Sequence, residues 1–256
     1  MSTEWILAAF TVALSVISVI FSGFFAVRTT RLSHQLDDER ARKREEESAI
    51  KAAERVYEPL AQAAAELQSR IYNIVETGWV PLMKRYESHG DYAITSTAFL
   101  FAHYFGWIEA RRQAVLGSSG EGKRDESVQA LIDGVLKILR RSDDGEGFLF
   151  FTTEQRGIGE LMCEWHTHPE TGVRTVNVMG YAAFRNRFND DPGFATWFGP
   201  VIAGMALVAR GDVKRLIDIQ AALVALIDTL DPKRRYTAGY ELKVIDLSDN
   251  AVPPTS

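Results

Sequence analysis

The most distinct pattern along the chain is an uninterrupted apolar run near its start. Trp5–Val27 comprises 23 residues without one charged side chain. A helix rises about 1.5 Å per residue, so this run is long enough to cross the roughly 30 Å hydrocarbon core of a bilayer. A cleaved signal peptide is the alternative, but Met1–Glu4 carries no Lys or Arg and the run exceeds the ~7–15 apolar residues of such a peptide. The pattern predicts a retained transmembrane anchor over residues 1–27.

Basic residues around the apolar run indicate its orientation. None precedes it, and six follow it closely: Arg28, Arg31, Arg40, Arg42, Lys43 and Arg44. By the positive-inside rule, the part after the run is cytoplasmic. We therefore expect a single-pass protein of the inner (cytoplasmic) membrane, with its N-terminus outside and the lipid bilayer as its first partner. The single cysteine, Cys163, agrees with a reducing compartment because it cannot form an intramolecular disulfide.

Charged residues dominate the next segment, residues 28–56, which contains neither Gly nor Pro. Pairs such as Glu39 and Lys43 lie four apart, a spacing that stabilises an exposed helix by a few tenths of a kcal/mol. Apolar residues at coiled-coil positions are not sustained over several heptads. The segment is predicted to be a solvated helical stalk.

Apolar residues then recur at helical spacing. The first series is Leu60, Ala63, Ala64, Leu67, Ile71, Ile74 and Val75. Its i, i+3, i+4, i+7 pattern predicts an amphipathic helix. Further helices are expected from Asp91, as N-cap, to about Val115, over about 125–141, and from Thr152 to about Trp165. Another is expected between Asp212, as its cap, and Asp231, where the following proline disfavours helical geometry.

Two segments need a choice between structures. Ala98–Ile108 is apolar nearly all round, and a second membrane span over Tyr92–Ile108 is the alternative, but His103 and three hydroxyl residues within it favour a buried core helix. Residues 173–178 alternate weakly, which is consistent with a short strand paired with residues 148–151. The predicted fold class is all-α: an anchor (1–27), a charged helical stalk (28–56), a multi-helix cytoplasmic domain (57–244) and a disordered tail (245–256).

Composition and motifs argue against several classes of function. The chain has 29 Lys and Arg against 34 Asp and Glu, a net charge of −5. We expect no nucleic-acid partner, because nucleic-acid binding relies on a clustered positive field. The chain contains no phosphate loop, no GxGxxG after a strand, no HExxH and no GxSxG motif. No cofactor is expected.

Potential metal ligands gather in one place, at Cys163, His166 and His168. On a helix reaching about Trp165, Cys163 and His166 share a face, whereas His168 precedes Pro169 and falls outside. Structural zinc needs four ligands, and catalytic zinc needs three with an open position. These residues are weak candidates, and no metal is expected.

Charged side chains on the predicted helices are the other candidates for chemistry. Glu154, Arg156 and Glu160 follow a helix start, where acidic residues complement the helix dipole, and Glu109 is expected to pair with Arg112. Catalytic roles would require such groups to converge in a cleft. The glycines at 157 and 159 are expected to allow close helix packing.

These features support two hypotheses. The leading one is a membrane-anchored protein that presents its helical domain to an unknown protein partner as a binding, scaffold or sensory-effector module. The alternative is a membrane-tethered enzyme, metal-dependent or not, with a site near Glu154–His168. Ser18, Ser22 and Ala26 lie four apart on the anchor, and small residues at this interval support a homodimer through the transmembrane helix.

Three segments carry a resemblance: Leu67–Val75, Phe99–Arg112 and Glu154–Met162. Through them, the region of about 57–232 resembles a loose group of bacterial membrane-anchored helical proteins that have no assigned activity. The resemblance implies a bacterial inner-membrane location, and it brings no catalytic residues to carry over.

Overall fold

The structure is a computed structural model. It describes residues 39, 41–44, 55–77, 90–115, 123–142, 145, 147–167, 169–170 and 174–246. Contacts divide the chain into two compact units, Met1–Ala49 and Ile50–Ser256. The predicted anchor, most of the stalk and residues 247–256 lie outside the described residues, so these remain predictions. No helix that the structure describes combines the length and the apolar character needed to cross a bilayer.

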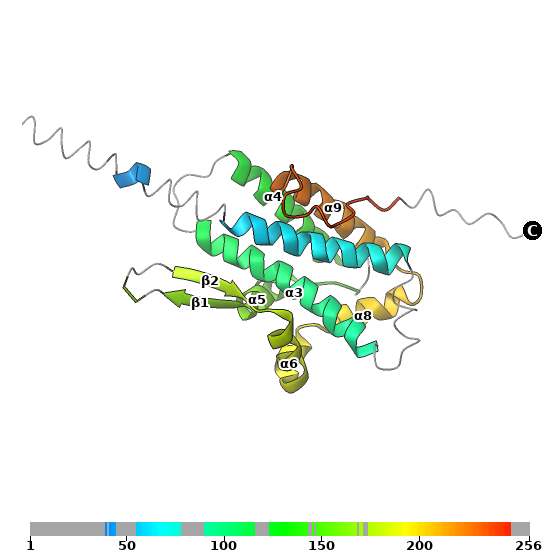
Figure 1. The fold of residues 1–256 in the computed structure, drawn as a ribbon. Coiled ribbons are helices and arrows are strands. Elements are labelled where there is room, and N and C mark those ends of the chain that lie inside the picture. Colours follow the sequence, from blue (N-terminus) through cyan, green and yellow to red (C-terminus); the bar gives the residue numbers. More distant parts are fainter. Residues whose placement is uncertain are drawn as a thin grey trace, which may run out of the picture. The chain divides into compact units, whose positions relative to one another are not determined.

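The larger unit is mostly helical, which confirms the all-α prediction for the described part of the chain (Figure 1). Its helices are residues 55–76 (helix 55–76), α3 (Gly90–Val115), α4 (Lys123–Leu139), α5 (Thr152–Met162), α6 (Tyr181–Asp190), α7 (Pro192–Thr196), α8 (Gly199–Val208) and α9 (Lys214–Leu230). Among the residues described, the one sheet is a hairpin of β1 (Cys163–Thr167) and antiparallel β2 (Arg174–Val178).

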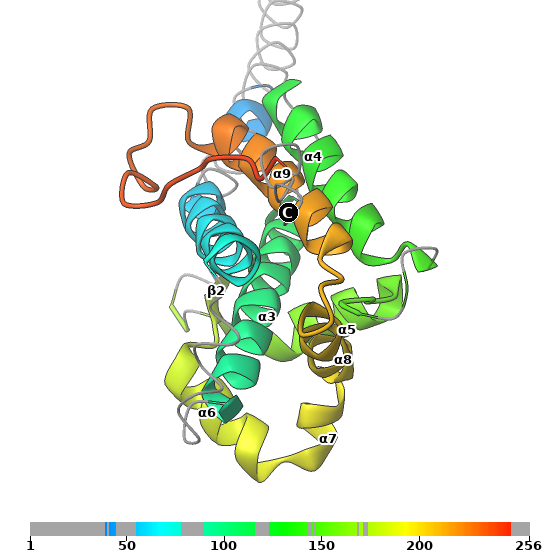
Figure 2. The same cartoon turned by 90° about the vertical axis from the view of Figure 1, so that its right-hand side faces the viewer.

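Helix α3 runs through the middle of this unit, as its apolar sequence predicts (Figure 2). Phe101, Tyr104 and Phe105 are fully buried on it. It packs against α5, and α4 packs against α9. On its other side, the guanidinium of Arg70 on helix 55–76 donates to the Ser96 hydroxyl at 2.7 Å. Burial on several sides explains why this helix lacks the polar face of a surface helix.

Gly159 allows α3 and α5 to approach closely, as expected. A Cβ atom at this position would lie 2.7 Å from the backbone oxygen of Phe105 and 3.1 Å from the Cβ of Glu109. Gly157, two residues earlier, leaves room for the Trp197 ring, which would lie 2.8 Å from an added Cβ. Both glycines serve packing.

The region after α5 differs from the prediction. The helix was expected to reach about Trp165, but it ends at Met162, and the chain continues as β1. The expected short strand is present as residues 174–178, but its partner is β1, with Cys163 opposite Val178, and not residues 148–151, which the sequence allowed as a partner. Phe148 instead has a φ of +54°, and its backbone N–H donates to the carbonyl of Pro200 at 2.9 Å. Residues 163–167 form a strand because they pair with residues 174–178. Local periodicity does not reveal such long-range pairing.

Two predicted N-caps are also wrong. Helix α9 begins at Lys214 after Val213, which makes no side-chain cap, so Asp212 lies outside the helix. Asp91 lies inside the first turn of α3, where it complements the helix dipole. The predicted end of α9 at Asp231 is confirmed.

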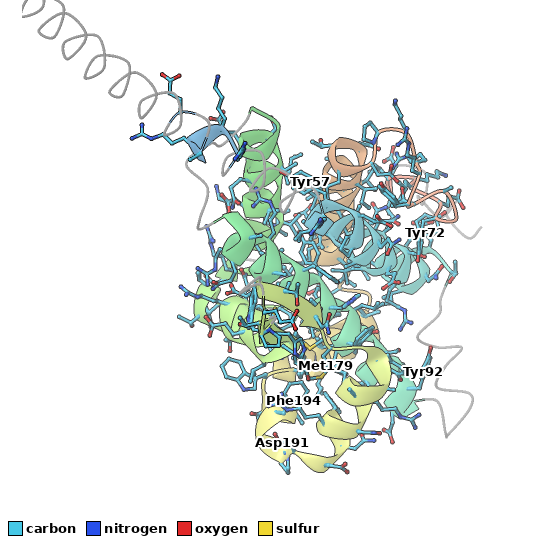
Figure 3. All side chains as sticks on the ribbon, turned by 60° about the vertical axis from the view of Figure 1, so that its left-hand side comes forward. Tyr57, Tyr72, Tyr92, Met179, Asp191 and Phe194 are labelled. Carbon is cyan, nitrogen blue, oxygen red and sulfur yellow. The ribbon has the colours of Figure 1, made fainter. Side chains whose placement is uncertain are left out.

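Three short helices that the sequence patterns did not reveal, α6, α7 and α8, close one end of α3. Their aromatic rings pack together, with Phe184 lying 5.4 Å from Phe194 and 5.5 Å from Phe99 of α3 between ring centroids. Asp191 caps α7, because its carboxylate accepts from the Phe194 N–H at 3.0 Å (Figure 3). This aromatic cluster stabilises helices too short to be stable alone.

Candidate functional site

Two of the three candidate metal ligands, Cys163 and His166, lie on one strand. Cys163 and His166 are three apart on β1, so their side chains lie on opposite faces of the strand. The expectation that they share a helical face is therefore wrong, and His168 lies outside the described residues. Within the described part of the chain, no three His, Cys, Asp or Glu side chains form a group that could hold a metal ion.

Cys163 has a structural environment. Its thiol donates to the backbone oxygen of Gly106 on α3 at 3.3 Å. Burial, together with the negative charge of Glu109, raises the pKa of the Cys163 thiol to about 12. Because the thiolate is the nucleophilic form, this cysteine is inert near neutral pH.

This environment predicts slow alkylation of Cys163. At pH 8, iodoacetamide should modify the native protein on the order of 100-fold more slowly than the protein unfolded in urea, where the thiol pKa returns to about 8.5. Mass spectrometry of the intact chain over time measures both rates. Equal rates in the two conditions would contradict this environment and favour the enzyme hypothesis.

A small cavity lies where α3, α4 and α5 meet, and we call it the arginine cleft. Its volume is about 190 Å³. The lining residues from each helix share a face through i, i+3, i+4 or i+7 spacing. They are Phe105, Ile108, Glu109 and Arg112 from α3, Asp133, Leu136 and Arg140 from α4 and the residue after it, and Thr152, Gln155 and Arg156 from α5.

Side-chain hydrogen bonds hold the walls of the arginine cleft together. The amide of Gln155 donates to the Leu136 carbonyl at 3.0 Å and to the Phe150 carbonyl at 2.8 Å, which ties α5 to the end of α4. The guanidinium of Arg111 donates to the Gln129 amide oxygen, which ties α3 to α4. With the close α3–α5 contact at Gly159, these bonds preorganise the cleft.

The buried carboxylate of the arginine cleft is already neutralised. Glu109 is 4% exposed, and Arg112 donates to its two oxygens at 2.7 and 2.6 Å, so the predicted ion pair is confirmed. Gln113 adds a hydrogen bond at 2.9 Å. Burial alone would raise the pKa of Glu109, but the hydrogen bonds from Arg112 and Gln113 lower it below the usual range. Glu109 is therefore an ionised structural group and a poor proton donor.

The arginines that line the cleft keep unused donors. Arg112 contacts Glu109 through Nε and Nη2, and Arg156 contacts Glu160 through Nε at 2.9 Å. Among the described residues, their Nη1 groups have no partner, and the Arg140 guanidinium has none. Phe105, Ile108 and Leu136 are the apolar members of the lining. The lining of the cleft therefore combines cationic and apolar side chains.

The other predicted candidates have local roles. The carboxylate of Glu154 accepts from the Phe151 N–H at 2.7 Å and so caps α5, one residue earlier than expected from Thr152. Glu160 forms an exposed pair with Arg156. The sequence did not identify Arg140 and Leu136 as residues of a site. Their helical spacing is visible in the sequence, but the contact between α4 and α5 that forms the cleft is not.

Comparisons of this chain with known protein families, curated proteins and solved structures found no match. The resemblance stated from the sequence stays a prediction. Function must be argued from the geometry and chemistry of the site itself.

Proposed function

We propose that this chain is a single-pass membrane-anchored binding module whose helical domain, on the cytoplasmic side, holds a small organic carboxylate in the arginine cleft. The observation that carries this proposal is that three arginines and three apolar side chains line one cavity. The membrane location rests on the uncharged run Trp5–Val27 and on the basic residues that follow it.

The chemistry of the cleft favours a carboxylate with an apolar body. A guanidinium presents N–H donors in a planar fork that matches the two oxygens of a carboxylate. The three arginines against Glu109 and Asp133 leave a net charge of 3 − 2 = +1. The volume of about 190 Å³ is below the ~300–1,000 Å³ of drug-sized ligand sites, so the ligand is small.

The roles of the titratable groups favour binding over catalysis. Glu109 is ion-paired, Glu154 caps α5, and Cys163 is a protonated thiol hydrogen-bonded to a carbonyl. An enzyme near Glu154–His168 would need an acid, base or nucleophile aimed at a shared point. Among the described residues of this segment, those that line the cleft are Gln155 and Arg156. Neither is an acid, base or nucleophile, and both are suited to holding an anion.

Calorimetric titration of the full chain in a neutral detergent with phenylacetate tests this proposal. We expect saturable binding that weakens about tenfold in Arg140→Gln, because one charge-assisted hydrogen bond contributes roughly 1.5–3 kcal/mol. Arg140 is exposed and has no described partner, so the substitution should leave stability unchanged. Phenylacetamide, which has the same shape without the charge, should not bind.

Arg210→Gln is the matched control, because Arg210 is exposed after α8 and does not line the cleft. It removes the same charge and should bind phenylacetate like the unmodified chain. Equal weakening in both variants would show a general field effect. Undetectable binding of phenylacetate would contradict the proposed site.

A further inference from the structure

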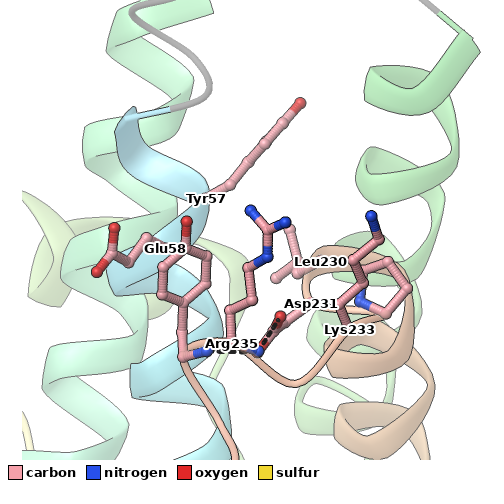
Figure 4. Close-up of a pocket in the computed structure, with 8 residues that line it drawn as sticks. Tyr57, Glu58, Leu230, Asp231, Lys233 and Arg235 are labelled. Carbon is pink, nitrogen blue, oxygen red and sulfur yellow. Dashed lines mark hydrogen bonds between the residues drawn. The ribbon is translucent and has the colours of Figure 1, made fainter.

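A second cavity, of about 410 Å³, lies between helix 55–76 and the segment that follows α9 (Figure 4). We call it the tyrosine cavity. Its lining includes Tyr57 on helix 55–76 and Lys233, Arg235 and Tyr236 from the segment after α9. It shares no lining residue with the arginine cleft. The two cavities can therefore be tested separately.

The carboxylate of Asp231 fixes the segment that carries the cations of the tyrosine cavity. It accepts from the backbone N–H groups of Arg235 and Tyr236, each at 2.8 Å, and from Thr237 at 3.0 Å. The Thr237 hydroxyl donates to the same carboxylate at 3.0 Å. Four donors on one side chain that is 3% exposed hold the segment in a single conformation.

Arg234 has a strained backbone in the middle of this segment. Its φ is +53°, a left-handed conformation that residues with a Cβ adopt rarely. Its guanidinium pairs with Asp228 on α9, and it does not line the cavity. Such strain persists only where surrounding contacts impose it, and it concentrates at ligand-binding segments. Here, the two neighbours of Arg234 in the sequence both line one cavity. These neighbours are Lys233 and Arg235.

Both of these cations are available for a ligand. In the described part of the chain, neither Lys233 nor Arg235 has an ion pair. Figure 4 shows their side chains extending in the same direction from the segment after α9, with Tyr57 beyond the end of Arg235. The Tyr236 hydroxyl also lines the cavity and has no partner among the described residues. Two carboxylates line the cavity, Glu58 and Asp231. The Asp231 carboxylate already accepts hydrogen bonds from the backbone, so Glu58 is the other acidic group of the lining.

We propose that the tyrosine cavity binds a phosphomonoester group, held by Arg235 and Lys233. A phosphomonoester carries about −1.5 to −2 charges at neutral pH, so it can engage both cations more fully than a carboxylate can. Of the two carboxylates in the lining, Asp231 already accepts four hydrogen bonds, and Glu58 comes from the opposite wall on helix 55–76. Arg235 supplies a forked donor, and Lys233 supplies a point charge. The cavity is larger than a phosphate, so its volume leaves space for the group esterified to it.

Two sources supply this chemistry, a soluble phosphomonoester and the headgroup of phosphatidate in a bilayer. Glycerol 3-phosphate is the common probe, because it has the same phosphomonoester of glycerol as the lipid. The full chain is placed in nanodiscs of phosphatidylcholine and titrated with glycerol 3-phosphate by calorimetry. The titration is repeated in nanodiscs in which one tenth of the lipid is phosphatidate.

We expect saturable binding in phosphatidylcholine nanodiscs that weakens at least tenfold in the double variant Lys233→Gln/Arg235→Gln. The control is Lys137→Gln/Arg210→Gln, which removes the same two charges from exposed positions outside the cavity and should bind normally. Competition by phosphatidate would assign the site to the lipid headgroup, and unchanged binding would assign it to a soluble ligand.

Equal weakening in the two double variants would overturn the proposal. So would the absence of saturable glycerol 3-phosphate binding, if phosphatidate also fails to protect Lys233 from acetylation. The Arg140→Gln variant should bind glycerol 3-phosphate normally. Failure of the carboxylate site therefore leaves this test unaffected.

Discussion

Replacing Gly159 with alanine is expected to destabilise the domain by about 1–3 kcal/mol or more. The added methyl group would lie 2.7 Å from the backbone oxygen of Phe105, which cannot move without shifting α3. Overpacking of this kind typically costs about 1–3 kcal/mol. Alanine has a higher helix propensity than glycine by ~1 kcal/mol, but this gain is smaller than the clash. The contact between α3 and α5 would have to open.

Gly134→Ala is the matched control for this substitution. Gly134 lies inside α4, and no atom approaches within 4 Å of the Cβ that alanine would add. The same chemical change should therefore stabilise the protein by about 0.5–1 kcal/mol through helix propensity alone. Urea denaturation followed by circular dichroism measures both free energies of unfolding. Changes of the same sign would contradict the packing of α3 on α5.

The opening of the α3–α5 contact should also reach the arginine cleft. Phe105 and Glu109, the two residues that an alanine at position 159 would strike, both line the cleft. We therefore expect Gly159→Ala to weaken phenylacetate binding, whereas Gly134→Ala should leave it unchanged.

The Asp231→Ala variant is expected to lose about 3 kcal/mol of stability. The substitution removes the acceptor of three backbone N–H groups and one hydroxyl, at 2.8–3.0 Å. Hydrogen bonds to a charged group contribute roughly 1.5–3 kcal/mol, and buried donors left unpaired add a further cost. Asp212→Ala is the control at the opposite end of α9, where the side chain is exposed and caps no helix. Its free energy of unfolding should change by less than about 0.5 kcal/mol.

The contribution of Asp231 should depend on pH. Burial alone would raise the pKa of its carboxyl, but the hydrogen bonds from Tyr236, Arg235 and Thr237 lower it below the usual range. The folded state therefore binds this proton less tightly than the unfolded state, whose Asp pKa is about 3.9. The stabilisation is present above that value and is lost as the pH falls through the folded-state pKa.

Free energies of unfolding at pH 7 and near pH 3 test this dependence. The unmodified chain should lose more stability between these values than Asp231→Asn does, since the amide has no proton to gain. Glu109 has a lowered pKa as well, so part of the acid dependence should remain in the variant. An identical loss in both proteins would show that the Asp231 carboxylate is not held by these donors.

Local signals in the sequence predicted those features whose partners lie within about one helical turn. The apolar spacing of Leu60–Val75 predicts a helix that the structure contains. Asp231 before Pro232 predicts the end of α9, and the i, i+3 spacing of Glu109 and Arg112 predicts their ion pair. Each follows from backbone geometry and side-chain reach alone.

Predictions failed where partners came from distant parts of the chain. Cys163–Thr167 has the pattern of a helix end, but pairing with residues 174–178 draws it into a strand. Asp212 has the composition of an N-cap, but α9 starts two residues later without one. Local propensities differ by only about 1 kcal/mol, so tertiary contacts readily override them.

The sequence by itself determined the helical class of the described domain, the central position of α3 and the acidic balance that disfavours nucleic acids, because these depend on composition and periodicity. Its uncharged run Trp5–Val27 supports the predicted anchor in the same way. Only the tertiary structure decided that Arg112, Arg140 and Arg156 line one cavity, and that Tyr57, Lys233 and Arg235 line another. These residues come from elements far apart in the chain, and their meeting depends on how helix faces pack, which no local spacing encodes.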